Sequence, residues 1–167
     1  HTVKILSLKG QFWKWRMHGG AITLAQNFHE MDWRPDLILV TDMLDLTTFL
    51  SLTRKKTFDI PTVIYFHENQ ISYPWSPNDR DVKNKRDNHY GFINYSSALT
   101  ADKVLFNSKF HMDSFLNALH PFLKQFPDQR CIDTIKIIKE KSDVLHLGID
   151  LKYFNKHQQK YNNNNKP

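Results

Sequence analysis

Four polar residues in succession, His67, Glu68, Asn69 and Gln70, carry the strongest chemical signal in the sequence. They follow an apolar run, residues 63–66, that is typical of a buried strand. Imidazole, carboxylate and amide groups can all hydrogen-bond a ligand. Because parallel α/β sheets bind their ligands at the carboxyl ends of the strands, the run predicts a ligand site. The alternative for His67 is a structural role, as a cap on the strand.

The rest of the chain alternates strand and helix patterns. This alternation predicts an α/β fold, a Rossmann-like parallel sheet with helices on both faces. A loop is expected at residues 9–18, and Asp42 or Asp45 is expected to cap the second helix. Strands are expected at residues 3–8, 36–40, 62–66, 103–106 and 143–147, and helices at 20–31, 45–54, 90–100, 108–120 and 128–141.

Right-handed crossovers would bring the carboxyl ends of all these strands to one edge of the sheet. Helix amino termini point at the same edge and favour anions, so a phosphate-bearing or polyhydroxylated ligand would fit there. Asn107 and Ser108 belong to this group, although the pair is also an ordinary helix cap. The residues expected to gather there are Lys9, Gly10, Thr41, Asp42, residues 67–70, Asn107, Ser108 and Gly148.

A second signal is the stretch at residues 12–16, FWKWR, which interleaves aromatic and basic side chains. Such a mixture is typical of stacking on bases or sugars with phosphate pairing, and Trp13, Trp15 and Arg16 are the candidate contacts. The alternative is a hydrophobic anchor that folds a loop onto the domain. The net charge of +6 permits an anionic partner such as nucleic acid, or merely keeps the protein soluble.

Other signatures are missing from the sequence. There is no glycine-rich phosphate loop, HExxH motif, zinc-spaced Cys/His cluster or GxSxG motif, so no metal site is predicted. No apolar run approaches the length of a membrane span. A single cysteine, Cys131, excludes an internal disulfide and fits a reducing compartment. Residues 1–151 are expected to form one domain, and the Asn-rich residues 152–167 a polar tail or linker.

Three blocks together resemble a known family. They are residues 60–71, IPTVIYFHENQI, followed by Tyr73-Pro74; residues 12–21, FWKWRMHGGA; and residues 101–108, ADKVLFNS, followed by Ser114-Phe115-Leu116. A shorter block, FPD at residues 126–128, agrees with them. The order and spacing are similar to those of the glycosyltransferase-like family that includes tRNA-queuosine alpha-mannosyltransferase.

The resemblance implies the amino-terminal, acceptor-side half of a retaining GT-B glycosyltransferase, which transfers mannose from GDP-mannose to queuosine in tRNA. It implies that His67 contacts the transferred sugar and supports the charge at the anomeric carbon. Substrate contacts are expected from Glu68, Asn69, Gln70, Asn107, Ser108, Trp13, Trp15 and Arg16. The family implies tRNA and a nucleotide sugar as partners, no metal or other cofactor, no membrane, and a cytoplasmic or nuclear location.

In the family, a first strand would precede Val3 and a carboxyl-terminal domain would hold most nucleotide contacts. Both are expected outside this sequence, so the isolated chain is expected to show no transferase activity. Two other functions stay open at this point. One is a non-catalytic tRNA- or nucleic-acid-binding module, and the other is a GT-B enzyme that acts on a lipid or glycan.

Overall fold

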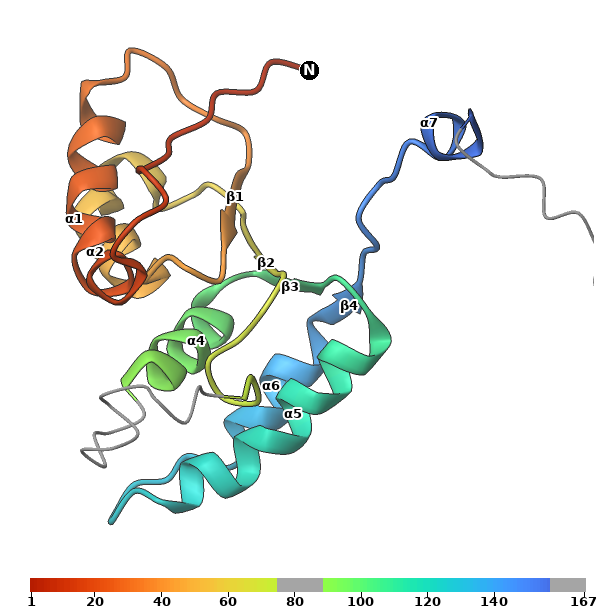
Figure 1. Ribbon diagram of the computed structural model, residues 1–167. Coiled ribbons are helices and arrows are strands. Elements are labelled where there is room, and N and C mark those ends of the chain that lie inside the picture. The colour runs from red at the N-terminus through yellow and green to blue at the C-terminus, as the bar shows by residue number, and fades with distance from the viewer. Residues whose placement is uncertain (75–88, 157–167) are drawn as a thin grey trace, which may run out of the picture.

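The computed structural model of the chain describes residues 1–74 and 89–156. Figure 1 shows a sheet seen nearly edge-on with helices packed beside it. In chain order the elements are α1 (Trp13–Glu30), β1 (Ile38–Thr41), α2 (Leu46–Thr57), β2 (Thr62–Phe66), α4 (His89–Thr100), β3 (Lys103–Phe106), α5 (Lys109–Lys124), α6 (Thr134–Glu140), β4 (Ser142–Val144) and α7 (Leu151–Lys156).

The four described strands form a parallel sheet in the order β1-β2-β3-β4. The registers Thr41↔Tyr65 and Phe66↔Phe106 bring the ends of the three longer strands level with one another. The α/β class and the parallel sheet predicted from the alternating pattern are thus confirmed. Strands β2 and β3 have the predicted bounds, because each is a short β-branched and aromatic run that polar residues follow directly.

The core lies on one face of this sheet. Ile64, Phe66, Val104 and Phe106 are fully buried and share one cluster with side chains from α1, α2, α4, α5 and α6. Strand residues of the opposite face are more accessible, and Leu39 is 64% exposed. Among the described residues the helices therefore cover one face (Figure 1), and the expected second layer is not seen.

Side-chain caps fix where two of the helices begin. Asp45 accepts a hydrogen bond from the backbone nitrogen of Thr48 at 3.0 Å and so starts α2. Ser108 accepts from the backbone nitrogen of His111 at 3.2 Å and so starts α5. Both caps satisfy amide groups that the first helical turn leaves unpaired. Of the two caps proposed for the second helix, Asp45 is correct.

The predicted strand at residues 3–8 is wrong. The segment has no strand partner among the described residues, and Val3 and Ile5 are 77% and 82% exposed. Its alternation instead reflects packing, because Leu6 contacts the core cluster and a methyl of Leu8 lies 3.4 Å from where a Cβ would stand on Gly20. Alternation alone does not make a strand where no neighbouring backbone supplies the hydrogen bonds.

The predicted loop at residues 9–18 is also wrong in its second half. α1 starts at Trp13, directly after Phe12 turns the chain with a left-handed backbone of φ 54°. Trp13, Trp15 and Arg16 therefore lie on a helix. The sequence predicts a helix only from residue 20, but buried Met17 and Ala21 hold the first turns against the core.

The other helix boundaries differ for local reasons. α5 continues past Pro121 to Lys124 because Phe122 and Leu123 are buried in the core, which offsets the hydrogen bond lost at proline. α6 begins only at Thr134, since Gln129 and Cys131 have positive φ angles that no helix accepts.

Part of the sequence interpretation falls outside the described residues. This holds for the polar stretch with Asp79, Asp81 and Asp87, and for residues 157–167 of the expected tail. The start of that tail forms α7. Within the described residues, no helix is both long enough and apolar enough to cross a membrane.

The packing of three phenylalanines yields a stability prediction. The rings of Phe66, Phe106 and Phe115 lie 5.0 to 5.5 Å apart and are fully buried. We expect Phe106→Ala to lower the free energy of unfolding by about 3–5 kcal/mol, measured by urea denaturation. Phe58→Ala, which removes a ring that is 82% exposed, should change it by less than about 0.5 kcal/mol. Similar losses for both variants would contradict this assignment of the core.

Candidate functional site

The candidate site is built where β1, β2 and β3 end. Asp42 follows β1, His67 follows β2 and Asn107 follows β3. Backbone hydrogen bonds extend the ladder by one step, from Asp42 N to the carbonyl of Tyr65 at 3.3 Å and from Asn107 N to that of Phe66 at 3.2 Å. The Asn107 side-chain amide donates to the carbonyl of His67 at 2.9 Å. The predicted gathering of strand ends is thus confirmed for these three positions.

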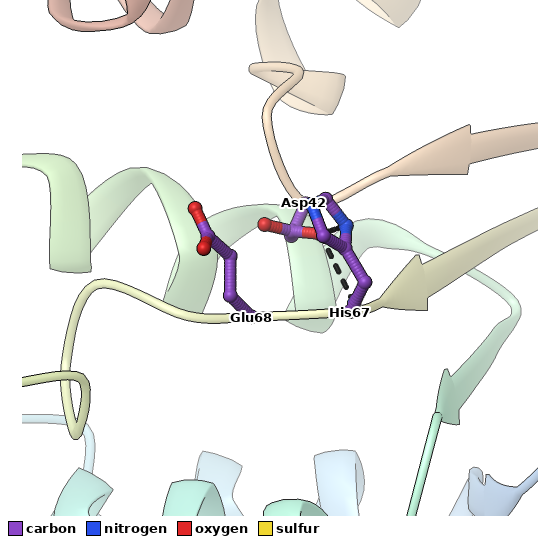
Figure 2. A group of neighbouring side chains, drawn as sticks. All are labelled: Asp42, His67 and Glu68. Carbon is purple, nitrogen blue, oxygen red and sulfur yellow. Dashed lines mark hydrogen bonds and ion pairs between the residues drawn. The ribbon is translucent and has the colours of Figure 1, made fainter.

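A histidine–aspartate pair lies at the centre of the site (Figure 2). His67 Nδ1 is 2.5 Å from Asp42 Oδ1, and the His67 backbone nitrogen donates to the same oxygen at 3.2 Å. The Asp42 side chain is only 1% exposed, whereas that of His67 is 46% exposed. Since Nδ1 is bound on the buried side, Nε2 is the ring nitrogen that a ligand can reach.

The pair changes the charge that His67 presents. The hydrogen bond with Asp42 raises the pKa of the imidazole above 6.5, partial burial opposes this, and the charges of Asp42 and Glu68 add to the increase. The protonated ring therefore gains population near neutral pH, and in that form Nε2 is a hydrogen-bond donor. Towards solvent, the pair therefore presents a hydrogen-bond donor, and the Asp42 carboxyl group lies buried behind it.

Asn94 of α4 fastens this pair to the polar run that follows it. Its Nδ2 donates to the backbone carbonyl of Asp42 at 2.8 Å, and its Oδ1 accepts from the backbone nitrogen of Gln70 at 2.7 Å. Asn94 is fully buried. One side chain therefore satisfies backbone groups from two different loops, as a buried amide requires.

Asn69 shapes the loop from inside. It is 2% exposed, and its Oδ1 accepts from the backbone nitrogens of Ile71 at 3.0 Å and Ser72 at 2.8 Å, closing a tight turn. Its Nδ2 donates to Ser72 Oγ at 2.9 Å and lies 2.8 Å from Nε2 of His111. Asn69 therefore positions the loop, and its amide is already occupied.

His111 completes this frame and must be neutral to do so. Its Nε2 accepts from Asn69, and its Nδ1 lies 3.0 Å from Asn107 Oδ1, which is an acceptor. The network thus assigns the hydrogen to Nδ1. Burial lowers the pKa of His111 below 6.5, which agrees with a neutral ring.

The predicted site residues therefore fall into two groups. His67, Glu68 and Gln70 are accessible to solvent, whereas Asn69, Asn107 and Ser108 hold the loop and the start of α5. Asp42 was expected at this edge of the sheet, whereas Asn94 and His111 are further site residues that the sequence interpretation did not assign. Both left a signal: Asn94 interrupts an apolar helix, and His111 lies four residues after Asn107, which is one helical turn.

Three further predicted contacts lie on the first turn of α1. Trp13 packs against Tyr90 of α4, with ring centroids 5.3 Å apart. Trp15 is 66% exposed and lies across Gly19, where an added Cβ would stand 3.1 Å from its ring. Arg16 is half-buried, and its Nε has no hydrogen-bond partner among the described residues. Lys9, Gly10 and Gly148 make no described contact with the histidine–aspartate pair.

Asp42, His67 and Glu68 also form the one group among the described residues that could hold a metal ion. Each offers one ligand atom, and these atoms lie within 4.8 Å of one another. However, the Nδ1 atom of His67 is already bonded to Asp42. The hydrogen bond accounts for the closeness of these two residues, so we assign no metal here.

Two matches to known proteins bear on the family of this chain. A family model described as tRNA-queuosine alpha-mannosyltransferase N-terminal matches residues 1–149. A Drosophila melanogaster protein named tRNA-queuosine alpha-mannosyltransferase is 35% identical over 151 residues. That alignment covers 90% of this chain and 38% of the fly protein. The chain therefore spans well under half the length of this relative.

The histidine–aspartate pair predicts a measurable titration. We expect the His67 ring to titrate above pH 6.5 in NMR spectra, and Asp42→Asn to lower its midpoint. Because the folded-state pKa is raised, the stability that the pair contributes is full below pH 6.5 and is lost as pH rises through that pKa. Glu68→Gln, which removes the weakest of the three causes, should lower the midpoint less. An unchanged midpoint in Asp42→Asn would refute the role given to the aspartate.

His111 predicts the opposite pH dependence. Its folded-state pKa is lowered, so its contribution is full above pH 6.5 and is lost as pH falls through that pKa. A protonated Nε2 would also face the Asn69 amide donor-to-donor. Urea denaturation at about pH 7.5 and about pH 5.5 should show a larger acid loss of stability in the parent chain than in His111→Gln. Equal losses would mean that His111 does not titrate in this range.

Proposed function

The chain belongs to the tRNA-queuosine alpha-mannosyltransferase N-terminal family, and on this basis we propose that it is the acceptor-side part of a retaining GT-B glycosyltransferase. The proposed reaction is transfer of mannose from GDP-mannose to queuosine in tRNA. The name of the fly relative supports the sugar and the acceptor, and the earlier family resemblance suggests the GDP donor. The single cysteine is compatible with a cytoplasmic location.

One observation carries the proposal for the site: His67 follows a strand end, its Nδ1 is bound to buried Asp42, and its side chain is still 46% exposed. This is the position from which an imidazole can hydrogen-bond the transferred sugar. Asp42 fixes both the orientation of the ring and the nitrogen that carries the exposed hydrogen. Because the frame of Asn69, Asn94 and His111 holds the loop, little reorganisation is needed when a ligand binds.

The charge of the pair matters for this chemistry. Glycosyl transfer passes through a transition state with positive charge at the anomeric carbon. An isolated imidazolium would oppose that charge, but the carboxylate of Asp42 behind His67 makes the pair close to neutral overall. We therefore assign to His67 a hydrogen bond from Nε2 to a hydroxyl oxygen of the sugar. His67 then supports the transfer by positioning the sugar and through the dipole of the histidine–aspartate pair.

A transfer assay tests the proposal. The chain is joined to the carboxyl-terminal part of the fly relative, in place of the matching segment, and supplied with labelled GDP-mannose and queuosine-containing tRNA. We expect transfer by this chimera, about a hundredfold less in its His67→Ala variant, and a smaller loss in Asp42→Asn. His120→Ala removes an exposed histidine on α5 and should leave transfer unchanged. The isolated chain should be inactive.

Each part of the proposal has its own contrary outcome. Full transfer by the His67→Ala chimera would contradict the role of the imidazole. Turnover by the isolated chain would contradict the need for a second domain. Transfer of the sugar to a lipid or glycan, at a rate that tRNA does not increase, would contradict the proposal that tRNA is the acceptor.

A further inference from the structure

We infer that the amino-terminal turns of α1 and α4 form a stacking surface for the bases of a single-stranded RNA loop. The surface consists of four rings, Trp13, His18, His89 and Tyr90, called here the aromatic rim. It lies outside the histidine–aspartate pair, and none of the comparisons assigns a role to His18, His89 or Tyr90. Only the identification of the RNA as tRNA rests on the proposed function.

The rings form a continuous row across two helices. His18 and His89 are stacked, with centroids 4.2 Å apart and ring planes 10° from parallel. Tyr90 lies edge-on to His18 at 5.4 Å and is tilted against Trp13 at 5.3 Å. Residues far apart in the sequence thus build one row of rings.

This row is a surface feature. His18 and His89 are exposed, Trp13 is 39% exposed, and none of the four rings belongs to the core cluster. In a stacked pair each ring keeps an outer face, and such faces accept a further flat ring. Nucleobases stack on exposed aromatic and histidine side chains in this way, with little dependence on sequence.

The charge at the start of α1 suits a polyanion. Lys14 and Arg16 lie in its first turn, and residues 1–29 contain no aspartate or glutamate. Lys14 lies with its Nζ 5.6 Å from the Trp13 ring centre. The first turns of α1 and α4 also lack acidic residues. Backbone phosphates would meet this charge while bases stack on the rings.

The aromatic rim is connected to the candidate site through α4. Tyr90 precedes Asn94 by four residues, which on a helix is the same face and a rise of about 6 Å. Asn94 is the residue that holds both Asp42 and Gln70. Next to Tyr90, a Cβ on Gly91 would stand 3.1 Å from Ile71 of the loop after β2. Tyr90 of the rim therefore lies about one helical turn from the residue that holds this loop.

Fluorescence anisotropy on the full chain tests the inference without any sugar donor. The probes are a fluorescein-labelled RNA hairpin with a single-stranded loop and a blunt RNA duplex of equal length. We expect the hairpin to bind more tightly, and the double variant His18→Ala, His89→Ala to lose about tenfold of that affinity. His89→Phe, which keeps a ring, and Phe58→Ala, which removes an exposed ring elsewhere, should stay within about twofold.

A salt series separates stacking from charge. The double alanine variant should keep the slope of log affinity against log salt, whereas Lys14→Gln should reduce that slope by about one. The inference would be overturned by equal affinity for hairpin and duplex, or by unchanged hairpin binding in a folded double variant. The aromatic rim would then be a candidate surface for a protein partner. Because no transfer is measured, failure of the proposed reaction leaves the binding result intact.

Discussion

The candidate site depends on pairing the buried Asp42 side chain with His67. That side chain is 1% exposed, and a buried carboxyl group without partners would cost several kcal/mol. His67 supplies both a backbone donor and a ring nitrogen, from the end of the neighbouring strand. The parallel register of β1 and β2 brings the two residues together, so the sheet itself creates the pair. Any change in that register would leave the buried side chain of Asp42 without this partner.

A second constraint is that the loop after β2 must satisfy its own backbone within the protein. Asn69 closes the turn, Asn94 binds the backbone of Gln70 in this loop and of Asp42 after β1, and His111 connects Asn69 with Asn107. These amides and imidazoles come from four separate segments. Several polar residues that the sequence suggests as ligand contacts thus hydrogen-bond other parts of the protein instead. This frame lets His67 keep one orientation.

The sequence predicted the class of the fold and the bounds of β2 and β3, because a short apolar run with polar ends has only one good solution in a parallel sheet. It could not separate Glu68 and Gln70 from Asn69, since burial depends on the turn that Asn69 itself closes. It placed Asp42 at the same edge of the sheet as His67, but Asn94 and His111 lie 27 and 44 residues from His67 in the chain, beyond the reach of any local pattern. The start of α1 was missed because paired glycines weaken a helix only where nothing packs against it.

α4 joins the two parts of the molecule that matter for the proposed reaction. This helix carries Tyr90 of the aromatic rim and, one turn later, Asn94 of the frame. The separation between Tyr90 and Asn94 is therefore set by helix pitch, which varies far less than the length of a flexible linker. Holding two reactants at a constant distance converts a bimolecular step into an effectively unimolecular one. Since Asn94 also binds the carbonyl of Asp42, a shift of α4 would move the aromatic rim and the histidine–aspartate pair together.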